Sequence, residues 1–275
     1  MPELRDKSGT PGQSSDKGEQ KRAPVGLIVS ATLILVIIGA AAALIVPRMI
    51  GNDDGAATGT VTPAASGPST TASVDELFPA PPQRDQLGRV TLVAGDDYPF
   101  GRALPQHGAS GDLAPSAQPG GLVLMQYLRS STWVSETAGP ESIDERGVPH
   151  GFAHTPQGAA LAASWLWALS SNLDTAAAAI DDGFMLTGGE QVPEQSRREY
   201  KGMAAPMAAP MAFKVDWNPR LTNVAMAFTT KQGKWLVASI DVEWRDGDWA
   251  LRGFTGEQST VASLGPGFVQ WQAVR

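Results

Sequence analysis

The sequence contains no cysteine. Disulfide bonds, thiolate nucleophiles and thiolate metal sites are therefore excluded. This absence is compatible with a place outside the cytoplasm, because a domain as long as residues 87–275 buries enough apolar surface to fold without covalent cross-links.

Recognisable catalytic motifs are also absent. We find no G-x-S-x-G elbow, no P-loop and no G-x-G-x-x-G after a strand. The three histidines are His107, His150 and His154. His150 and His154 have the spacing of a zinc pair, but the prolines and glycine around them indicate a turn, and no glutamate completes an HExxH motif. We therefore predict no catalytic, cofactor-binding or metal-binding residue, no cofactor and no enzymatic activity.

Positive charge is scarce as well. The chain has 21 Lys and Arg against 28 Asp and Glu, which gives a formal net charge of −7. A protein with this balance is poorly suited to hold nucleic acid through phosphate contacts. We expect no direct nucleic-acid partner.

One long apolar run is present, at residues 25–46 (VGLIVSATLILVIIGAAAALIV). At about 1.5 Å per residue it spans about 33 Å, enough to cross a hydrocarbon core of about 30 Å. No other stretch has comparable length and apolarity. The run predicts a single transmembrane helix. A cleaved signal peptide is the alternative, which the length of the run and of the leader before it disfavour.

Basic residues near the run set its expected orientation. Three precede it, and one follows it: Lys17, Lys21 and Arg22, then Arg48. Because cytoplasmic flanks carry the excess of Lys and Arg, we predict a cytoplasmic N-terminus, a single pass through the cell membrane and an extracytoplasmic C-terminal domain. Within the run, Gly39 and Ala43 form a small-xxx-small pair that could let two helices associate.

The segments on either side of the run have linker-like compositions. Residues 1–24 mix charges with Gly, Pro and Ser and predict a disordered cytoplasmic tail. Residues 47–86 are rich in Ala, Gly, Ser, Thr and Pro and predict a flexible linker, with a small apolar island at 74–78 that could dock on the domain. Residues 87–275 then form the extracytoplasmic domain.

The first half of that domain contains strand-like and helical patterns. Runs at 89–94 and 122–128 resemble strands joined by an irregular loop. Thr155 and Pro156 are typical of a helix start, and an apolar stripe follows: Leu161, Trp165 and Leu169. Residues 175–180 predict a second short helix or a continuation of the first.

The connecting segment between the two halves carries a short repeat. Residues 190–201 resemble an exposed helix, and MAAPMAAPMAF then places Met203, Met207 and Met211 four residues apart. Proline at every fourth position prevents a helix, so we expect an extended segment. It is either a connector, which we favour, or an adaptable methionine-rich binding surface.

The second half has the clearest alternation. Apolar and polar side chains alternate from 236 to 245: Leu236, Ala238, Ile240, Val242 and Trp244 on one face, and Ser239, Asp241, Glu243 and Arg245 on the other. Strand patterns at 223–230 and 249–254 flank it across turn sequences. We predict an α+β fold with helices packed on a curved antiparallel sheet.

The tryptophan-containing meander carries a resemblance. With residues 243–251 (EWRDGDWAL), it is similar to the nuclear-transport-factor-two-like, cystatin-like fold. The layout resembles TcpC-like conjugation proteins and inner-membrane assembly subunits of type IV secretion systems, and residues 147–163 resemble uncharacterised actinobacterial proteins of conjugative elements. The resemblance implies scaffolding rather than catalysis. The chain departs from the TcpC-like pattern by having one convincing domain instead of two.

Two function hypotheses follow. The first is a membrane-anchored scaffold or interaction module of a conjugative or secretion assembly, whose partners are the bilayer and other envelope proteins; exposed Trp217 and Trp235 could mark a partner surface. The second is an envelope enzyme or small-ligand binder with a pocket in the curved sheet, for which strand carboxylates are the candidates: Asp216, Asp241 and Glu243. Alternation places Asp241 and Glu243 on a solvated outer face, which favours the first hypothesis.

Overall fold

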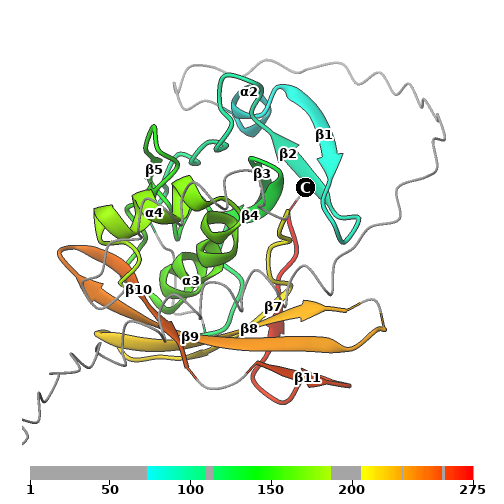
Figure 1. Cartoon of the computed structure of the whole chain (residues 1–275), viewed down its shortest axis with the longest axis vertical. Helices are drawn as coiled ribbons and strands as arrows, with labels where there is room; N and C mark the ends of the chain where they lie inside the picture. Colours follow the sequence, from blue (N-terminus) through cyan, green and yellow to red (C-terminus); the bar gives the residue numbers. More distant parts are fainter. Residues whose placement is uncertain (1–72, 109–113, 187–205, 231, 256–257, 275) are drawn as a thin grey trace, which may run out of the picture.

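The computed structural model describes residues 73–108, 114–186, 206–230, 232–255 and 258–274 (Figure 1). Among these residues, no helix is both long and apolar enough to cross a bilayer. The predicted tail, transmembrane helix and Gly39–Ala43 pair lie outside the described residues, as does the helix expected at 190–201.

A large antiparallel sheet forms one layer of the domain. Its strand order is β10-β9-β8-β7-β12, and β11 also pairs with β9. The strands are β7 (Ala212–Asp216), β8 (Leu221–Thr229), β9 (Trp235–Arg245), β10 (Asp248–Phe254), β11 (Ser259–Val261) and β12 (Val269–Gln270). Asp246 and Gly247 both have positive φ at the β9–β10 turn, as a tight hairpin turn requires. The predicted three-stranded meander is confirmed as β8, β9 and β10.

The helices begin and end where their capping residues place them. In α3 (Pro156–Ser170), the Thr155 side chain accepts the backbone N–H of Gly158, which satisfies one of the unpaired donors of the first turn. Asn172 caps α4 (Leu173–Asp182), which ends at the left-handed Gly183. The second helix is thus separate from the first.

Helix α3 is the centre of the core. It contacts β7 to β10 on one side and β4 on the other (Figure 1). All residues from Gln157 to Leu169 are buried, so the predicted apolar stripe faces a core and the other sides of the helix are buried as well. The reason is a second sheet that covers the helix face turned away from the large sheet.

The second sheet has the order β1-β2-β3-β4. Its strands are β1 (Ala80–Arg84), β2 (Val90–Val93), β3 (Val123–Tyr127) and β4 (Ser130–Val134). The β2–β3 pair is parallel and the other pairs are antiparallel. A short hairpin of β5 (Ser142–Ile143) and β6 (Pro149–His150) lies beside α4. The α+β class is confirmed, with open, curved sheets on both sides of α3.

The ordered domain includes the end of the segment predicted as linker. Helix α2 (Val74–Leu77) has a capping box between Ser73 and Glu76. Leu77 and Phe78 are buried, and β1 pairs with β2. The apolar island at 74–78 therefore docks on the domain, and residues 73–86 are part of the folded structure rather than of a flexible spacer.

The described part of the Met-Ala-Ala-Pro repeat has no regular secondary structure and docks against β4. The side chains of Ser130 and Ser131 accept the backbone N–H groups of Met207 and Ala209. The Trp133 indole donates to the Pro210 carbonyl at 2.8 Å. Met207 is buried, which supports the connector interpretation; Met203 lies outside the described residues.

Candidate functional site

The strand carboxylates lie on the outer face of the large sheet. Asp241 accepts a hydrogen bond from the Asn223 side chain at 2.8 Å, and Glu243 lies 3.5 Å from Arg252. Asp216 is exposed at the end of β7. On the opposite face the side chains of β9 are fully buried under α3: Ala238, Ile240 and Val242. Side chains thus fill the sheet face on which the second hypothesis places a pocket.

Trp217 and Trp235 are not neighbours on the large sheet. Trp235 is the first residue of β9. Trp217 directly follows Asp216, which pairs with Asn223 of β8, and Asn223 in turn pairs with Asp241 of β9. Six residues of strand separate the two positions, about 20 Å at about 3.3 Å per residue. Trp217 is therefore not close to Trp235, contrary to the expectation, and a role of these tryptophans in partner binding stays a prediction.

Trp217 belongs instead to an aromatic cluster that consists of His154, Trp217, Trp244 and Trp249. The rings of His154 and Trp244 are stacked, with centroids 4.0 Å apart and an interplanar angle of 8°. Trp249 meets Trp244 and Trp217 edge to face at 5.2 and 5.8 Å. These separations are those of favourable aromatic pairs.

Burial within the aromatic cluster is uneven. Trp249 is buried, and its indole donates to the Ala153 carbonyl at 2.9 Å. His154 is exposed, and its Nε2 donates to the Pro219 carbonyl at 2.7 Å. Trp217 and Trp244 are half-buried. The aromatic cluster therefore presents a rigid, partly open aromatic surface at one end of the large sheet.

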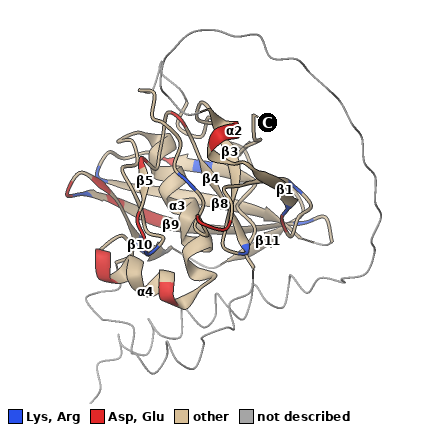
Figure 2. Cartoon of the chain, turned by 90° about the horizontal axis from the view of Figure 1, so that it is seen from above, with Lys and Arg blue, Asp and Glu red and all other residues tan. Residues whose placement is uncertain are grey.

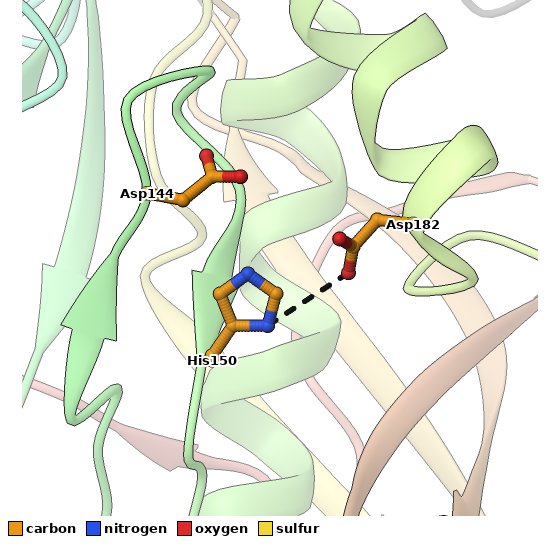
Figure 3. A group of neighbouring side chains, drawn as sticks. All are labelled: Asp144, His150 and Asp182. Carbon is orange, nitrogen blue, oxygen red and sulfur yellow. Dashed lines mark ion pairs between the residues drawn. The ribbon is translucent and has the colours of Figure 1, made fainter.

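His150 lies in a different cluster, with Asp144 and Asp182 (Figure 3). Asp144 follows β5, His150 ends β6, and Asp182 ends α4. One potential ligand atom from each residue lies within 4.8 Å of the others. His150 Nδ1 is 3.8 Å from Asp182 Oδ2. We call this group the Asp–His–Asp cluster.

Arg146 joins the two carboxylates of the Asp–His–Asp cluster. Its Nε donates to Asp144 Oδ2 at 2.9 Å and its terminal NH2 group to Asp182 Oδ1 at 2.7 Å. Asp144 Oδ1 accepts the backbone N–H groups of Arg146 and Val148. Burial alone would raise the pKa of Asp144, but these hydrogen bonds outweigh it and hold the pKa below its usual value of 3.8.

Asp248 fixes the backbone next to His150. Its carboxylate accepts the N–H groups of Gly151 at 2.6 Å and Phe152 at 3.0 Å. Burial raises the pKa of Asp248 above its usual 3.8, although these hydrogen bonds and the nearby His150 act in the opposite direction. The contact ties the chain between His150 and His154 to β10.

An open hollow of about 420 Å³ adjoins the Asp–His–Asp cluster. Arg146, which bridges the two carboxylates of the cluster, also lines the hollow. The other lining residues are Phe100, Leu128, Asn172, Asp174, Thr175, Ala178 and Asp181. Acidic residues mark both ends of α4 in Figure 2. The hollow thus combines apolar side chains with one guanidinium and a mainly acidic rim.

Sequence spacing could not reveal the Asp–His–Asp cluster. Asp144 and His150 meet Asp182 only because α4 folds back beside the β5–β6 hairpin. Similarly, the i, i+4 spacing of His150 and His154 is misleading: the turn at Gly151, with φ 78°, leads the two side chains into separate clusters.

These features define an α+β domain whose sheets enclose one central helix, with two polar or aromatic groupings at its surface. The family model "Domain of unknown function (DUF8175)" matches residues 93–267, and the chain belongs to this family. The matched range contains both the aromatic cluster and the Asp–His–Asp cluster. No curated protein and no solved structure matches the chain.

Proposed function

We propose that the chain is a membrane-anchored, extracytoplasmic interaction module of a cell-envelope assembly, and specifically of a conjugative-transfer or type IV secretion apparatus. Residues 25–46 anchor it with a cytoplasmic N-terminus, and the linker lifts the domain off the bilayer. The domain acts as a scaffold and has no catalytic role. Its partners are other envelope proteins, with self-association through Gly39 and Ala43, and no nucleic acid.

The aromatic cluster carries this proposal. Half-buried Trp217 and Trp244 are held in place by a buried Trp249 and by the stacked His154. Rigid aromatic side chains that are partly exposed are enriched at protein interfaces, because they bury a large area at a low entropic cost. A partner protein that covers this surface would gain apolar contact with the two half-buried indoles.

The arrangement of α3 on β7 to β10 supports the finer fold assignment. A helix that crosses the inner face of an antiparallel meander is what the cystatin-like resemblance implies. We therefore propose that residues 145–255 form a nuclear-transport-factor-two-like unit, to which β1 to β4 add a second layer. The TcpC-like layout extends this proposal to conjugation.

A second candidate function is a small-ligand binder or envelope enzyme. The observation that favours it is the hollow beside α4, since a volume of about 420 Å³ falls within the range of small-molecule sites. A small ligand or substrate would have to bind in this hollow, because α3 fills the inner face of the large sheet.

Transfer efficiency in the native cell tests the main proposal. A deletion strain is complemented with the wild-type chain, Trp244→Ala, Trp217→Ala or the control Trp235→Ala, and each chain is quantified in the membrane. We expect the deletion, Trp244→Ala and Trp217→Ala to lower DNA transfer about tenfold or more, because partly exposed aromatic side chains supply much of the contact at an interface, and Trp235→Ala to transfer normally. Unchanged transfer in the deletion strain would contradict the conjugation role. Equal behaviour of the three tryptophan variants would contradict the aromatic cluster as the contact.

A further inference from the structure

The Asp–His–Asp cluster combines one imidazole and two carboxylates from three separate elements. The imidazole distinguishes this cluster from a purely acidic one. Imidazole favours zinc and other first-row transition metals, whereas calcium and magnesium prefer oxygen ligands alone. Each residue reaches the common centre from a hairpin or a helix end that neighbouring hydrogen bonds fix.

The spacing of the donor atoms also fits a shared ion better than a direct contact. The 3.8 Å between His150 Nδ1 and Asp182 Oδ2 is too long for a hydrogen bond. Two ligands at about 2.0–2.1 Å from one tetrahedral ion lie about 3.3–3.5 Å apart. Figure 3 shows the imidazole below the two carboxylates, and the three donor atoms lie within 4.8 Å of one another.

Arg146 acts as a positioning residue for the carboxylates of Asp144 and Asp182. It binds Asp144 Oδ2 and Asp182 Oδ1, and this leaves Asp182 Oδ2 directed toward His150. Outer contacts of this kind orient metal-binding carboxylates in other proteins. The Arg146 side chain is itself 45% exposed, so it has room to adjust when a cation enters.

The charge around the cluster favours a further cation. Asp181 and Asp182 occupy the last turn of α4, where the helix dipole places partial negative charge, and that turn has no basic residue. Among the described residues, the two carboxylates of the cluster, Asp144 and Asp182, share one guanidinium, that of Arg146. A divalent ion would offset the excess negative charge of these carboxylates, which lie on the β5–β6 hairpin and on the end of α4.

We propose that Asp144, His150 and Asp182 form a binding site for one divalent transition-metal ion, of the zinc or manganese class. The ion joins the β5–β6 hairpin to the end of α4 and fixes one wall of the hollow, and water or a ligand in the hollow completes its coordination. This site does not depend on the proposed function, because it requires neither the membrane anchor nor a protein partner.

Metal binding to the full-length chain in detergent tests the site. The protein carries no histidine tag and is first treated with a chelator. Equilibrium dialysis with elemental analysis then measures the binding of Zn²⁺ and Mn²⁺, with Mg²⁺ and Ca²⁺ as comparison ions, and thermal unfolding is followed with and without each ion. We expect one Zn²⁺ or Mn²⁺ per chain, weaker binding of Mg²⁺ and Ca²⁺, and a rise in Tm of several degrees.

Matched variants assign the ion to these residues. His150→Ala and Asp182→Asn should each lower the affinity at least tenfold and abolish the Tm rise, while they unfold in chelator near the wild-type temperature. His107→Ala removes a histidine elsewhere, and Asp174→Asn removes a carboxylate at the other end of α4; both should change the affinity less than twofold. Binding below one ion per chain, or equal loss in cluster and control variants, would overturn the proposal.

Discussion

The imidazole of His154 lies flat against the indole of Trp244, with 4.0 Å between ring centroids and 8° between planes. This contact fixes the turn before α3 to the β9–β10 hairpin, which lies far away in the sequence. Because His154 is stacked on Trp244, it does not form a zinc pair with His150, which lies in the Asp–His–Asp cluster instead.

Replacement of His154 by alanine should destabilise the domain. The variant loses one stacked aromatic contact and the hydrogen bond to the Pro219 carbonyl. Together these predict a fall of about 1–2 kcal/mol in the free energy of unfolding, measured by denaturant titration of the full-length chain. His107→Ala, at an exposed position where the side chain makes a hydrogen bond to the carbonyl of Pro105, should stay within about 0.5 kcal/mol of the wild type. Equal effects of the two variants would contradict the structural role of the stack.

Ser131 tests whether the Met-Ala-Ala-Pro connector is part of the core. Its buried hydroxyl accepts the N–H of Ala209 at 3.0 Å and donates to Asp85 at 3.1 Å. Ser131→Ala leaves that buried N–H unpaired, so we expect a loss of about 1–3 kcal/mol in the free energy of unfolding. The control Ser263→Ala, at an exposed turn, should be nearly neutral. Fragment release by limited proteolysis should also rise in Ser131→Ala, and an unchanged cleavage pattern would argue against docking of the connector.

Gly158 permits the close approach of the chain before α3. A Cβ at this position would overlap the carbonyl oxygen of Ala153. Because the obstacle is backbone, Gly158→Ala should cost about 3 kcal/mol or more, at the upper end of overpacking effects. Gly265→Ala is the matched control, since nothing lies within 4 Å of a Cβ there and its φ is ordinary. Thermal unfolding compares the two, and a stable Gly158→Ala variant would contradict this packing.

Asp144 should make the domain sensitive to acid. Its pKa in the folded state is below 3.8, because hydrogen bonds from Val148 and Arg146 outweigh the opposite effect of burial. The ionised carboxylate therefore contributes stability that is complete above about pH 4 and is lost as the pH falls through the folded-state pKa. Asp144→Asn removes this contribution. Between pH 5 and pH 3, about one unit either side of the ordinary pKa, the Tm of the wild type should fall more than that of the variant. Parallel profiles of Tm against pH would contradict the prediction.

For Asp248 we expect the opposite dependence of stability on pH. Burial raises its folded-state pKa above 3.8, so its contribution to stability decreases as the pH rises from 3.8 through that pKa. Relative to the wild type, Asp248→Asn should therefore lose less Tm over this rise in pH. The variant also alters the hydrogen bonds to Gly151 and Phe152, so the slope rather than the absolute Tm is the quantity to compare.

Local patterns in the sequence predict the second half of the fold well. Alternation along β9, the turn at Asp246 and Gly247, and the capping of α3 by Thr155 each depend on neighbouring residues, and each is confirmed. The same kind of information fails where distant segments meet. The parallel β2–β3 pair and the cover of α3 by β4 arise from contacts that no short-range period encodes.

One signal for the buried α3 was nevertheless present. Alanines occupy the sides of the helix away from the Leu161–Trp165–Leu169 stripe, and a helix that is apolar all round belongs inside a core. The Asp–His–Asp cluster had no such signal, because its third member is supplied by the end of another helix.

Membrane topology tests the central proposal most directly. Since the chain has no cysteine, a single cysteine can be introduced as Ser263→Cys on the exposed surface of the domain, or as Ser8→Cys in the N-terminal tail. Each full-length variant is treated in intact native cells with a membrane-impermeant maleimide. An anchored extracytoplasmic module predicts that Ser263→Cys is labelled in intact cells and that Ser8→Cys is labelled only after lysis. Labelling of Ser263→Cys only after lysis would contradict the account.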